Sequence, residues 1–215
     1  MLVEASGVKP NPSFMNKLLT VVFSFYSLIA LAQSTKPVLV GGCEGCDLMF
    51  AGMPKNLSSS TRIAATQGEP MRISGTIFQA DGKTPASNVV LYVYHTDAKG
   101  YYTPGTGQTE ARQHGQLRGW MKTDAQGRYE FSSIKPAPYP GDQIPAHIHP
   151  IVLEPNGKHY WLEDYFFEDD RIVTANMRAN KNPRGGRGIL SLTKDAQGVW
   201  VGQRDLVLGL HVPGY

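Results

Sequence analysis

Residues 88–96 read NVVLYVYHT, and every position from 89 to 94 within this stretch is apolar or aromatic. Successive side chains of a β-strand point to opposite faces, so residues 89, 91 and 93 would share one face and residues 90, 92 and 94 the other. Both faces are then hydrophobic, which predicts a strand that is covered on both sides. The stretch therefore favours a β-protein with this strand in its core.

The sequence on either side repeats an order of strand, turn and strand. Short runs rich in β-branched and aromatic residues are separated by turn signals: ADGK at 80–83, DAKG at 97–100 and DAQG at 124–127. The strands predicted in this way are 71–79, 88–96, 119–123, 128–134, 148–153, 158–162 and 199–208. DAQG returns at 195–198, and we interpret the recurrence as turn chemistry in which each turn starts an aromatic-led strand. The predicted fold class is all-β, a two-sheet β-sandwich.

Composition agrees with one globular domain of this class. The chain has 215 residues, of which 41% are hydrophobic and 18% charged, and its 23 Gly and 15 Pro favour short strands joined by turns. The net charge of +3 comes from scattered Lys and Arg residues, without the basic stripe that nucleic-acid binding needs. We therefore expect no nucleic-acid partner. The basic residues of the Gly, Asn and Arg-rich stretch 171–188 are interpreted as part of a solvated loop.

An export signal is predicted near the N-terminus. A lysine precedes an apolar run at 18–32 that ends in Ala-Leu-Ala, as in a signal peptide, and the run is shorter than the roughly 20 apolar residues of a membrane-spanning helix. We expect a signal peptide at 15–32, preceded by a non-native or disordered extension at 1–14. The mature form would be periplasmic or extracellular, without a membrane segment. It would comprise an N-terminal arm at 33–70 and a β-sandwich domain at 71–215.

The only two cysteines of the sequence, Cys43 and Cys46, lie in GGCEGCD within this arm. Export would place them in an oxidising compartment, where a local disulfide is the favoured interpretation. A redox dithiol would call for a following helix of a thioredoxin-like unit, and a zinc site would call for a second pair of ligands. Neither context lies nearby. Pairing with a cysteine of another chain is left open.

A metal-ligand spacing occurs in PAHIHP at 145–150. His147 and His149 are two residues apart, so on a strand both side chains would lie on the same face, about 7 Å apart. The pair alone does not distinguish metal ligands from packed histidines. A cupin-like metal motif would complete it, since Gly141 precedes the pair and Glu154 follows it at suitable spacing. No later histidine has the surroundings of a second cupin motif, so the cupin-like protein is kept as an alternative.

Two tyrosines point to a different completion of the site. Tyr102 lies in HTDAKGYYTP, and Tyr139 lies in KPAPYPGDQIPAHIH. A phenol loses its proton at about pH 10 in water, so a tyrosine ligand at neutral pH calls for a strong Lewis acid such as ferric iron. Either tyrosine alone could equally be a turn aromatic or a residue that packs against prolines. Together with the histidines, they predict an Fe(III) site rather than a zinc site.

At these stretches the sequence resembles the intradiol ring-cleavage dioxygenases, ferric enzymes that open catechol, protocatechuate and hydroxyquinol between the two hydroxyls. The matching segments are VYHTDAKGYY, LRGWMKTDAQGRYEFSSIKPAPYP, PAHIHP and YFFEDD, which occur in the family's order. The resemblance implies a β-sandwich of the intradiol type, in which long loops form a non-haem Fe(III) site with the ligands Tyr102, Tyr139, His147 and His149. It also implies a catechol-type aromatic diol and O2 as partners, and a muconate-type product.

The same resemblance assigns catalytic roles to Tyr139 and Tyr102. Tyr139 would leave the metal when the substrate binds and would then act as an internal base. The chain resembles the exported, single-domain branch of the family, which lacks the helical dimerisation domain of the catechol enzymes. Its oligomeric state is left open.

Two positions depart from the family's pattern. Ile144 stands where the family usually has an arginine that stabilises negative charge on the substrate, and Glu163 stands where it commonly has a glutamine. These residues would favour less negative substrates, unless Arg118 or Arg171 supplies a cation. The alternative from a different functional class is a non-enzymatic, transthyretin-like β-sandwich binding module. Such a module shares the strand and turn patterns but requires neither the histidine pair nor the two tyrosines.

Overall fold

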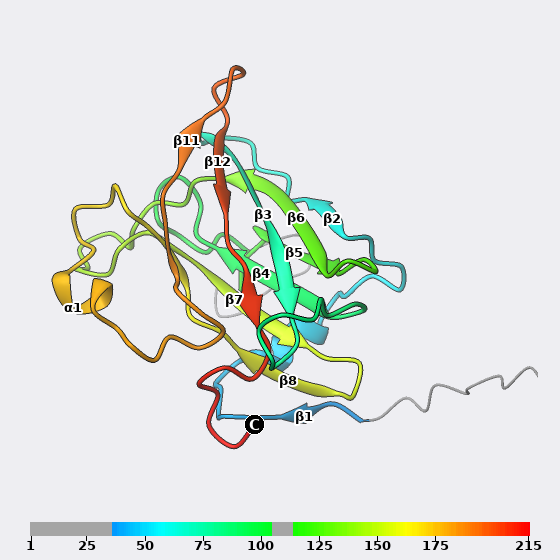
Figure 1. The fold of residues 1–215 in the computed structure, drawn as a ribbon. Helices are drawn as coiled ribbons and strands as arrows, with labels where there is room; N and C mark the ends of the chain where they lie inside the picture. Colours follow the sequence, from blue (N-terminus) through cyan, green and yellow to red (C-terminus); the bar gives the residue numbers. More distant parts are fainter. Residues whose placement is uncertain (1–35, 105–113) are drawn as a thin grey trace, which may run out of the picture. The chain divides into compact units, whose positions relative to one another are not determined.

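A computed structural model describes residues 36–104 and 114–215 of the chain (Figure 1). The described residues belong to one compact unit, Ser34–Tyr215. The predicted signal peptide at 15–32 and the extension at 1–14 lie outside the described residues. Within the two described ranges, no helix has the length and apolar character needed to cross a bilayer.

The described chain forms two β-sheets. One is seven-stranded, with the order β1 (Val38–Leu39), β8 (Lys158–Trp161), β7 (His147–Leu153), β4 (Val90–His95) and β5 (Arg118–Lys122); β9 (Tyr165–Phe167) pairs with β7, and β10 (Ile189–Leu190) pairs with β9. The other is six-stranded, with the order β11 (Thr193–Lys194), β12 (Trp200–Gln203), β3 (Pro70–Phe78), β6 (Arg128–Ile134) and β2 (Ser60–Arg62); β13 (Leu206–Val207) pairs with β3. The only helical elements of the described residues are the 3-10 helix η1 (Cys46–Phe50) and the one-turn α1 (Ala175–Arg178). The predicted all-β sandwich is confirmed.

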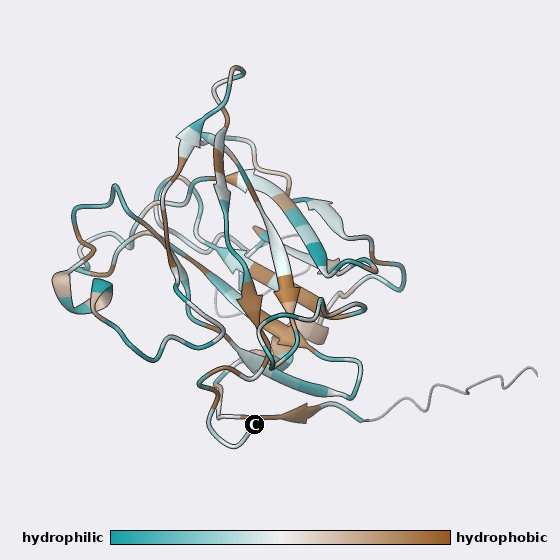
Figure 2. Ribbon diagram, viewed as in Figure 1, coloured by the Kyte–Doolittle hydropathy of each residue, from teal (hydrophilic) through white to brown (hydrophobic). Residues whose placement is uncertain are grey.

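The main core lies between the two sheets. Strand β3 buries every second residue, as its alternating sequence requires, and β4 buries both of its faces. Hydrophobic residues accordingly concentrate on β3, β4 and β7 (Figure 2). The central side chains with almost no exposed surface are Met71, Ile73, Ile77, Leu91, Val93, Met121, Phe131, Ile148, Val152 and Tyr160.

The outer face of the seven-stranded sheet is covered by the N-terminal arm. A second hydrophobic cluster there contains Cys46 and Met49 of the arm together with Val90, Tyr92 and Ile151 of the sheet. Two indole groups fasten the arm, because Trp120 Nε1 donates to the Met49 carbonyl (2.7 Å) and Trp161 Nε1 to the Gly42 carbonyl (3.0 Å). The prediction that residues 88–96 are covered on both sides is therefore confirmed, and the arm is what covers the second side.

The predicted local disulfide is also confirmed. Cys43 and Cys46 are joined, with their Cα atoms 5.6 Å apart. The bridge closes the loop that leads into η1. It therefore fixes the part of the arm that lies over the sheet.

The three Asp-Ala-x-Gly segments form the same turn. In each, the glycine N–H donates to the aspartate carbonyl, at 3.1 Å for Gly100, 3.0 Å for Gly127 and 2.9 Å for Gly198. Each glycine has a positive φ, which a residue without Cβ adopts at little cost. Turn chemistry is confirmed, but one expectation was wrong. The chain after Gly100 enters a loop rather than a strand, because Asp97 holds its backbone.

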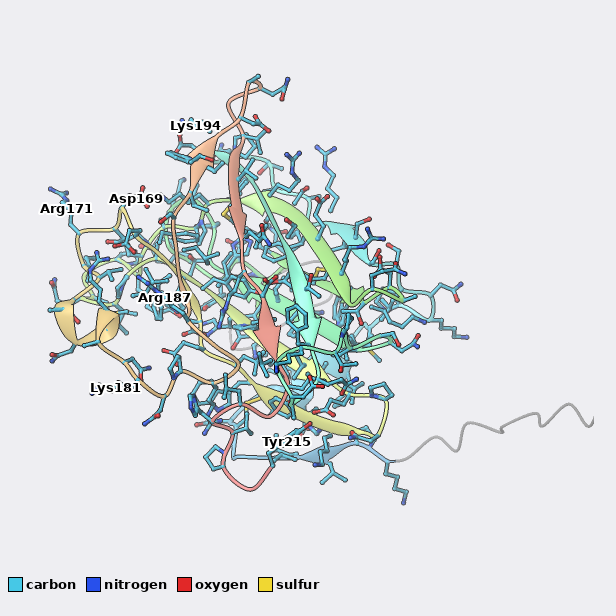
Figure 3. All side chains as sticks on the ribbon, viewed as in Figure 1. Asp169, Arg171, Lys181, Arg187, Lys194 and Tyr215 are labelled. Carbon is cyan, nitrogen blue, oxygen red and sulfur yellow. A yellow bond between two sulfur atoms is a disulfide. The ribbon has the colours of Figure 1, made fainter. Side chains whose placement is uncertain are left out.

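Some predicted boundaries also differ from the structure. The expected strand 199–208 is interrupted between β12 and β13, where the buried Arg204 donates to the carbonyls of Glu163 and Gly186. The stretch 171–188 is mostly loop, as expected, and contains α1. Arg171, Lys181 and Arg187 are exposed on this loop (Figure 3), which agrees with a solvated surface.

The buried His95 at the end of β4 predicts a pH-dependent stability. Burial lowers the pKa of His95 to about 4, whereas an unfolded chain has a histidine pKa of about 6.5. The unfolded state therefore binds the extra proton below the latter value, and the stabilisation by neutral His95 is lost as the pH falls from about 6.5 towards 4. We expect unfolding by urea to show a contribution from His95 of about 2 kcal/mol between pH 7 and 5. In His95→Gln this part of the pH dependence should disappear, and an unchanged pH dependence would contradict the assignment.

Candidate metal centre

Strand β7 presents the two histidines of the predicted site. His147 and His149 lie on the outer face of the seven-stranded sheet, while Ile148 between them points into the core. The start of β7 is held by Asp170, whose Oδ2 accepts the backbone N–H of Ala146 at 2.8 Å. The YFFEDD segment thus positions the histidine pair through Asp170 and through pairing of β9 with β7.

The DAKG turn positions Tyr102. Asp97 Oδ1 accepts the N–H of Tyr101 at 3.1 Å, and Asp97 Oδ2 accepts the Thr103 hydroxyl at 2.9 Å. Both neighbours of Tyr102 are therefore fixed by one carboxylate. This explains why Tyr102 is held in place although it belongs to no strand.

The same turn also supports the loop that carries Tyr139. The Asp97 carbonyl accepts the N–H of Ala137 at 3.2 Å, and the Thr96 hydroxyl donates to the Ala137 carbonyl at 2.7 Å. Gly100 lies so close to this loop that a Cβ atom on it would overlap the Pro138 carbonyl oxygen. The two tyrosine loops are thus packed directly against each other.

The structure brings all four predicted residues together at their polar atoms. Tyr102 Oη lies 2.7 Å from Tyr139 Oη and 3.0 Å from His149 Nε2. Tyr139 Oη lies 3.2 Å from His147 Nε2 and 3.5 Å from His149 Nε2, and the two Nε2 atoms are 3.0 Å apart. Ligands at about 2.1 Å from one metal ion have mutual separations of about 3 Å, so these distances match one coordination sphere.

The outer nitrogens of both imidazoles are bound to groups that can only accept hydrogen bonds. His147 Nδ1 donates to the Pro145 carbonyl at 2.7 Å, and His149 Nδ1 donates to Asp164 Oδ1 at 2.9 Å. In the neutral rings, both Nε2 atoms therefore carry lone pairs and no hydrogen. Two such atoms 3.0 Å apart repel each other, and a shared cation relieves the repulsion.

Burial shifts the titration of the same groups. Burial raises the pKa of Tyr102 and, to a smaller extent, that of Tyr139, because a phenolate is poorly solvated there. Burial, followed by the neighbouring His149, lowers the pKa of His147. The protein alone therefore favours neutral phenols and a neutral His147. A cation that binds the phenolate forms has to be a strong Lewis acid.

Two contributors to the site were missed in the sequence. Asp164 orients His149, and Tyr94 stacks on the His149 ring with the ring centroids 4.6 Å apart. Asp164 also lies within 4.8 Å of the two histidines as a potential ligand group. Because its Oδ1 already accepts His149 Nδ1–H, we assign it to positioning this imidazole. Strand pairing could have indicated Tyr94, which lies opposite His149 on β4.

Removing the Asp164 carboxylate should weaken metal binding. Partners that orient a metal-bound histidine typically contribute about 10- to 100-fold to affinity, and we expect a loss of this size in Asp164→Ala. Asp164→Asn keeps an oxygen acceptor for His149 and should lose less. Competitive chelator titration measures the affinities. The control is Asp169→Asn, which changes an exposed carboxylate that pairs with Lys135; equal affinities in all four proteins would contradict the role of Asp164.

The departures noted in the sequence have distinct positions. The side chain of Ile144 is 45% exposed. Glu163 is half-buried and points towards Asn180, with 3.5 Å between Oε1 and Nδ2, and burial raises its pKa. Arg118 lies over the Trp120 ring, 5.4 Å from its centroid, and Arg171 is exposed.

The cupin-like completion of the site is not assembled. Glu154 is buried away from the histidine pair, where it accepts the hydroxyl of Tyr160 at 2.7 Å and that of Tyr215 at 3.3 Å. Of the later histidines, His159 bonds to Asp47 and His211 to the Pro183 carbonyl. Glu154 is thus a structural acceptor, and its match to a cupin motif was misleading.

The fold is an all-β sandwich, and two histidines and two tyrosines converge on one outer sheet face. A protein-family model described as Dioxygenase matches residues 51–184. The chain belongs to this dioxygenase family, and its resemblance to the intradiol enzymes is confirmed. The match favours this family over the transthyretin-like module.

Several characterised proteins are similar in sequence. The protocatechuate 3,4-dioxygenase beta chain of Burkholderia cepacia is 34% identical over 121 residues, which are 53% of this chain and 48% of that protein. The 6-chlorohydroxyquinol 1,2-dioxygenase of Cupriavidus pinatubonensis is 30% identical over 202 residues, covering 87% of this chain and 68% of that protein. The chain spans half or less of the length of the catechol 1,2-dioxygenases that it matches; of catechol 1,2-dioxygenase 1 from Acinetobacter lwoffii it covers 22%.

Solved structures show the same fold. The dioxygenase domain of a dioxygenase and carbohydrate-binding fusion from Streptomyces sp. SirexAA-E superimposes with a TM-score of 0.54 at 22% identity, over 73% of this chain and 91% of that chain. The 3-chlorocatechol 1,2-dioxygenase of Rhodococcus opacus gives a TM-score of 0.53 at 21% identity, over 73% of this chain and 66% of that chain. At such identities the comparison bears on the fold alone.

Proposed function

We propose that the chain is a non-haem Fe(III) intradiol dioxygenase that opens a catechol-type ring with O2 to a muconate-type product. The observation that supports it is the convergence of Tyr102, Tyr139, His147 and His149, with five of the six separations between their Oη and Nε2 atoms at 2.7 to 3.5 Å. Two phenolates and two imidazoles suit ferric iron, whereas zinc sites are built from Cys, His and carboxylate ligands. The supporting hydrogen bonds from Pro145 and Asp164 fit this metal site.

Each residue around the metal would have a distinct role in the reaction. Bound Fe(III) supplies Lewis acidity, which favours ionisation of the substrate hydroxyls. Tyr102, Tyr139, His147 and His149 would hold the ion, and the phenolate oxygen of Tyr139, 2.7 Å from Tyr102 Oη, would accept a proton from a hydroxyl of the diol. Tyr94 and Asp164 would keep the His149 ring in its orientation.

A visible spectrum and a product analysis test this function. Protein loaded with ferric iron should be red-brown, because phenolate-to-iron charge transfer absorbs visible light, and Tyr139→Phe should stay folded with an altered band. Catechol and O2 should then give a muconate-type product. A colourless iron-loaded protein would refute the tyrosine ligands. A yellow semialdehyde product would mean extradiol cleavage and would refute the intradiol assignment.

The departures in sequence support a preference among substrates. Ile144 offers no positive charge to a ring carboxylate, and Glu163 and Asp164 directly precede strand β9, which pairs with the start of β7. Two like charges about 4 Å apart at an effective dielectric of about 20 repel by about 4 kcal/mol, before solvent screening reduces the effect. We expect faster cleavage of catechol, methylcatechol or hydroxyquinol than of protocatechuate, with slow turnover overall. Steady-state rates on these substrates measure it; protocatechuate as the best substrate would contradict the charge argument.

We also propose that the protein is exported. The apolar run at 18–32 and the disulfide between Cys43 and Cys46 support this proposal, since disulfides persist in oxidising compartments. Mass spectrometry of protein from the native host tests it. A chain that begins near Gln33 with both cysteines oxidised is expected, and an intact N-terminus with two free thiols would refute export.

A further inference from the structure

A cavity of about 210 Å³ lies on the outer sheet face beside the metal centre. The residues that line it include His149 and Asp164 of the centre, the aromatic residues Tyr94 and Trp161, and Cys43 and Glu44 of the N-terminal arm. The cavity is thus bounded jointly by the metal centre, the sheet and the arm.

The arm holds Glu44 firmly at this cavity. Glu44 lies inside the four-residue loop closed by the Cys43 to Cys46 disulfide. Just before it, the Gly42 carbonyl accepts Trp161 Nε1–H at 3.0 Å, and the Gly41 carbonyl accepts Arg184 Nη2–H at 3.1 Å. These contacts restrain the backbone of the loop that carries Glu44.

The charged side chains among the residues that line the cavity include two carboxylates, those of Glu44 and Asp164. The Arg184 guanidinium lies over the Trp161 ring, 3.8 Å from the centroid, and is not among the lining residues. Aromatic faces next to a carboxylate are the surroundings that proteins use to bind ammonium groups.

We propose that this cavity receives the ring substituent of a catechol bound at the metal centre and selects a protonated amino group over a carboxylate, with Glu44 as the specificity-determining residue. The inference rests on the proposed function and names its substrate class as aminoalkyl catechols. The volume is sufficient for a short side chain beyond the ring. Glu44 itself takes no part in the ring-opening chemistry.

Three catechols of similar size and different charge test the inference. They are 4-(2-aminoethyl)catechol, 4-ethylcatechol and 3,4-dihydroxyphenylacetate, which are cationic, neutral and anionic. Their affinities for the iron-loaded protein are measured without O2, from the change in visible absorption, so that binding is read rather than turnover. We expect the cationic compound to bind about tenfold more tightly than the anionic one, which corresponds to about 1.4 kcal/mol.

Variants of Glu44 test whether this residue causes the preference for the cationic catechol. Glu44→Gln should reduce the cation-to-anion affinity ratio to near one, and Glu44→Lys should invert it, with little change for 4-ethylcatechol. The control is Glu130→Lys on β6 of the other sheet, an identical charge change that should leave the ratio unaltered. A ratio near one in the unmodified protein, or a ratio that Glu44→Lys does not change, would overturn the inference. If 4-ethylcatechol itself does not perturb the absorption, the proposed function fails, and the inference fails with it.

Discussion

Replacing His147 with alanine is expected to abolish stable iron binding. His147 supplies one of only two imidazoles at the centre, and its Nδ1 is already committed to the Pro145 carbonyl, so no other atom of this residue can substitute. Loss of a group that only orients a ligand costs about 10- to 100-fold in affinity, and loss of the ligand itself should exceed that range. Metal analysis after dialysis against a chelator, together with the visible band, measures the result.

The matched control for this experiment is His211→Asn. His211 bonds to the Pro183 carbonyl and has a φ of 57°, a backbone conformation that asparagine tolerates. This variant should retain iron and colour. Thermal unfolding of both metal-free variants shows whether each is folded. Full iron content in folded His147→Ala would refute His147 as a ligand.

Gly100→Ala is expected to disrupt both tyrosine loops at once. Gly100 has a φ of 86°, which is unfavourable for alanine, and the new methyl group would overlap the Pro138 carbonyl next to Tyr139. The loops of Tyr102 and Tyr139 must then move apart. We expect a loss of about 3 kcal/mol or more in the free energy of unfolding, measured by urea denaturation, and a marked loss of iron affinity.

The variant Gly82→Ala separates the effect of backbone strain from that of the overlap with Pro138. Gly82 also has a positive φ, 67°, but a Cβ atom there would meet no other atom within 4 Å. Backbone strain alone should then cost about 1 to 2 kcal/mol, without an effect on iron binding. If Gly82→Ala and Gly100→Ala gave equal losses and both kept iron, the contact between Gly100 and Pro138 would have no role in the site.

The longer strands and the convergence of the four candidate donors could be predicted from the sequence. Runs rich in β-branched and aromatic residues between turn signals indicated β3, β4 and β6, and the apolar residues on both faces of β4 indicated that both faces are covered. The spacing of His147 and His149 indicated one shared face, because successive side chains of a strand point to opposite faces. The tyrosines followed from the family resemblance, because nothing in their loops has a periodic pattern.

The remaining features depend on contacts between distant segments. Strands of two or three residues, such as β1, β9 and β10, are too short to show a pattern and form because their neighbours offer free backbone groups. Asp164 meets His149 only because β9 pairs with β7. The loop after Gly100 was mistaken for a strand, since local sequence does not show that Asp97 bonds to residues on both sides of Tyr102.

The bridged loop of the arm and the metal donors come from separate stretches of the chain. The loop that carries Glu44 precedes residue 51, where the match to the family begins, whereas all four donors lie inside the match. A chimaera in which a foreign arm replaces residues 36–50 would therefore keep all four candidate donors. The graft would have to fill the hydrophobic cluster that Cys46 and Met49 form with the sheet. It must present carbonyl oxygens to the indole N–H groups of Trp161 and Trp120, where Gly42 and Met49 now accept them.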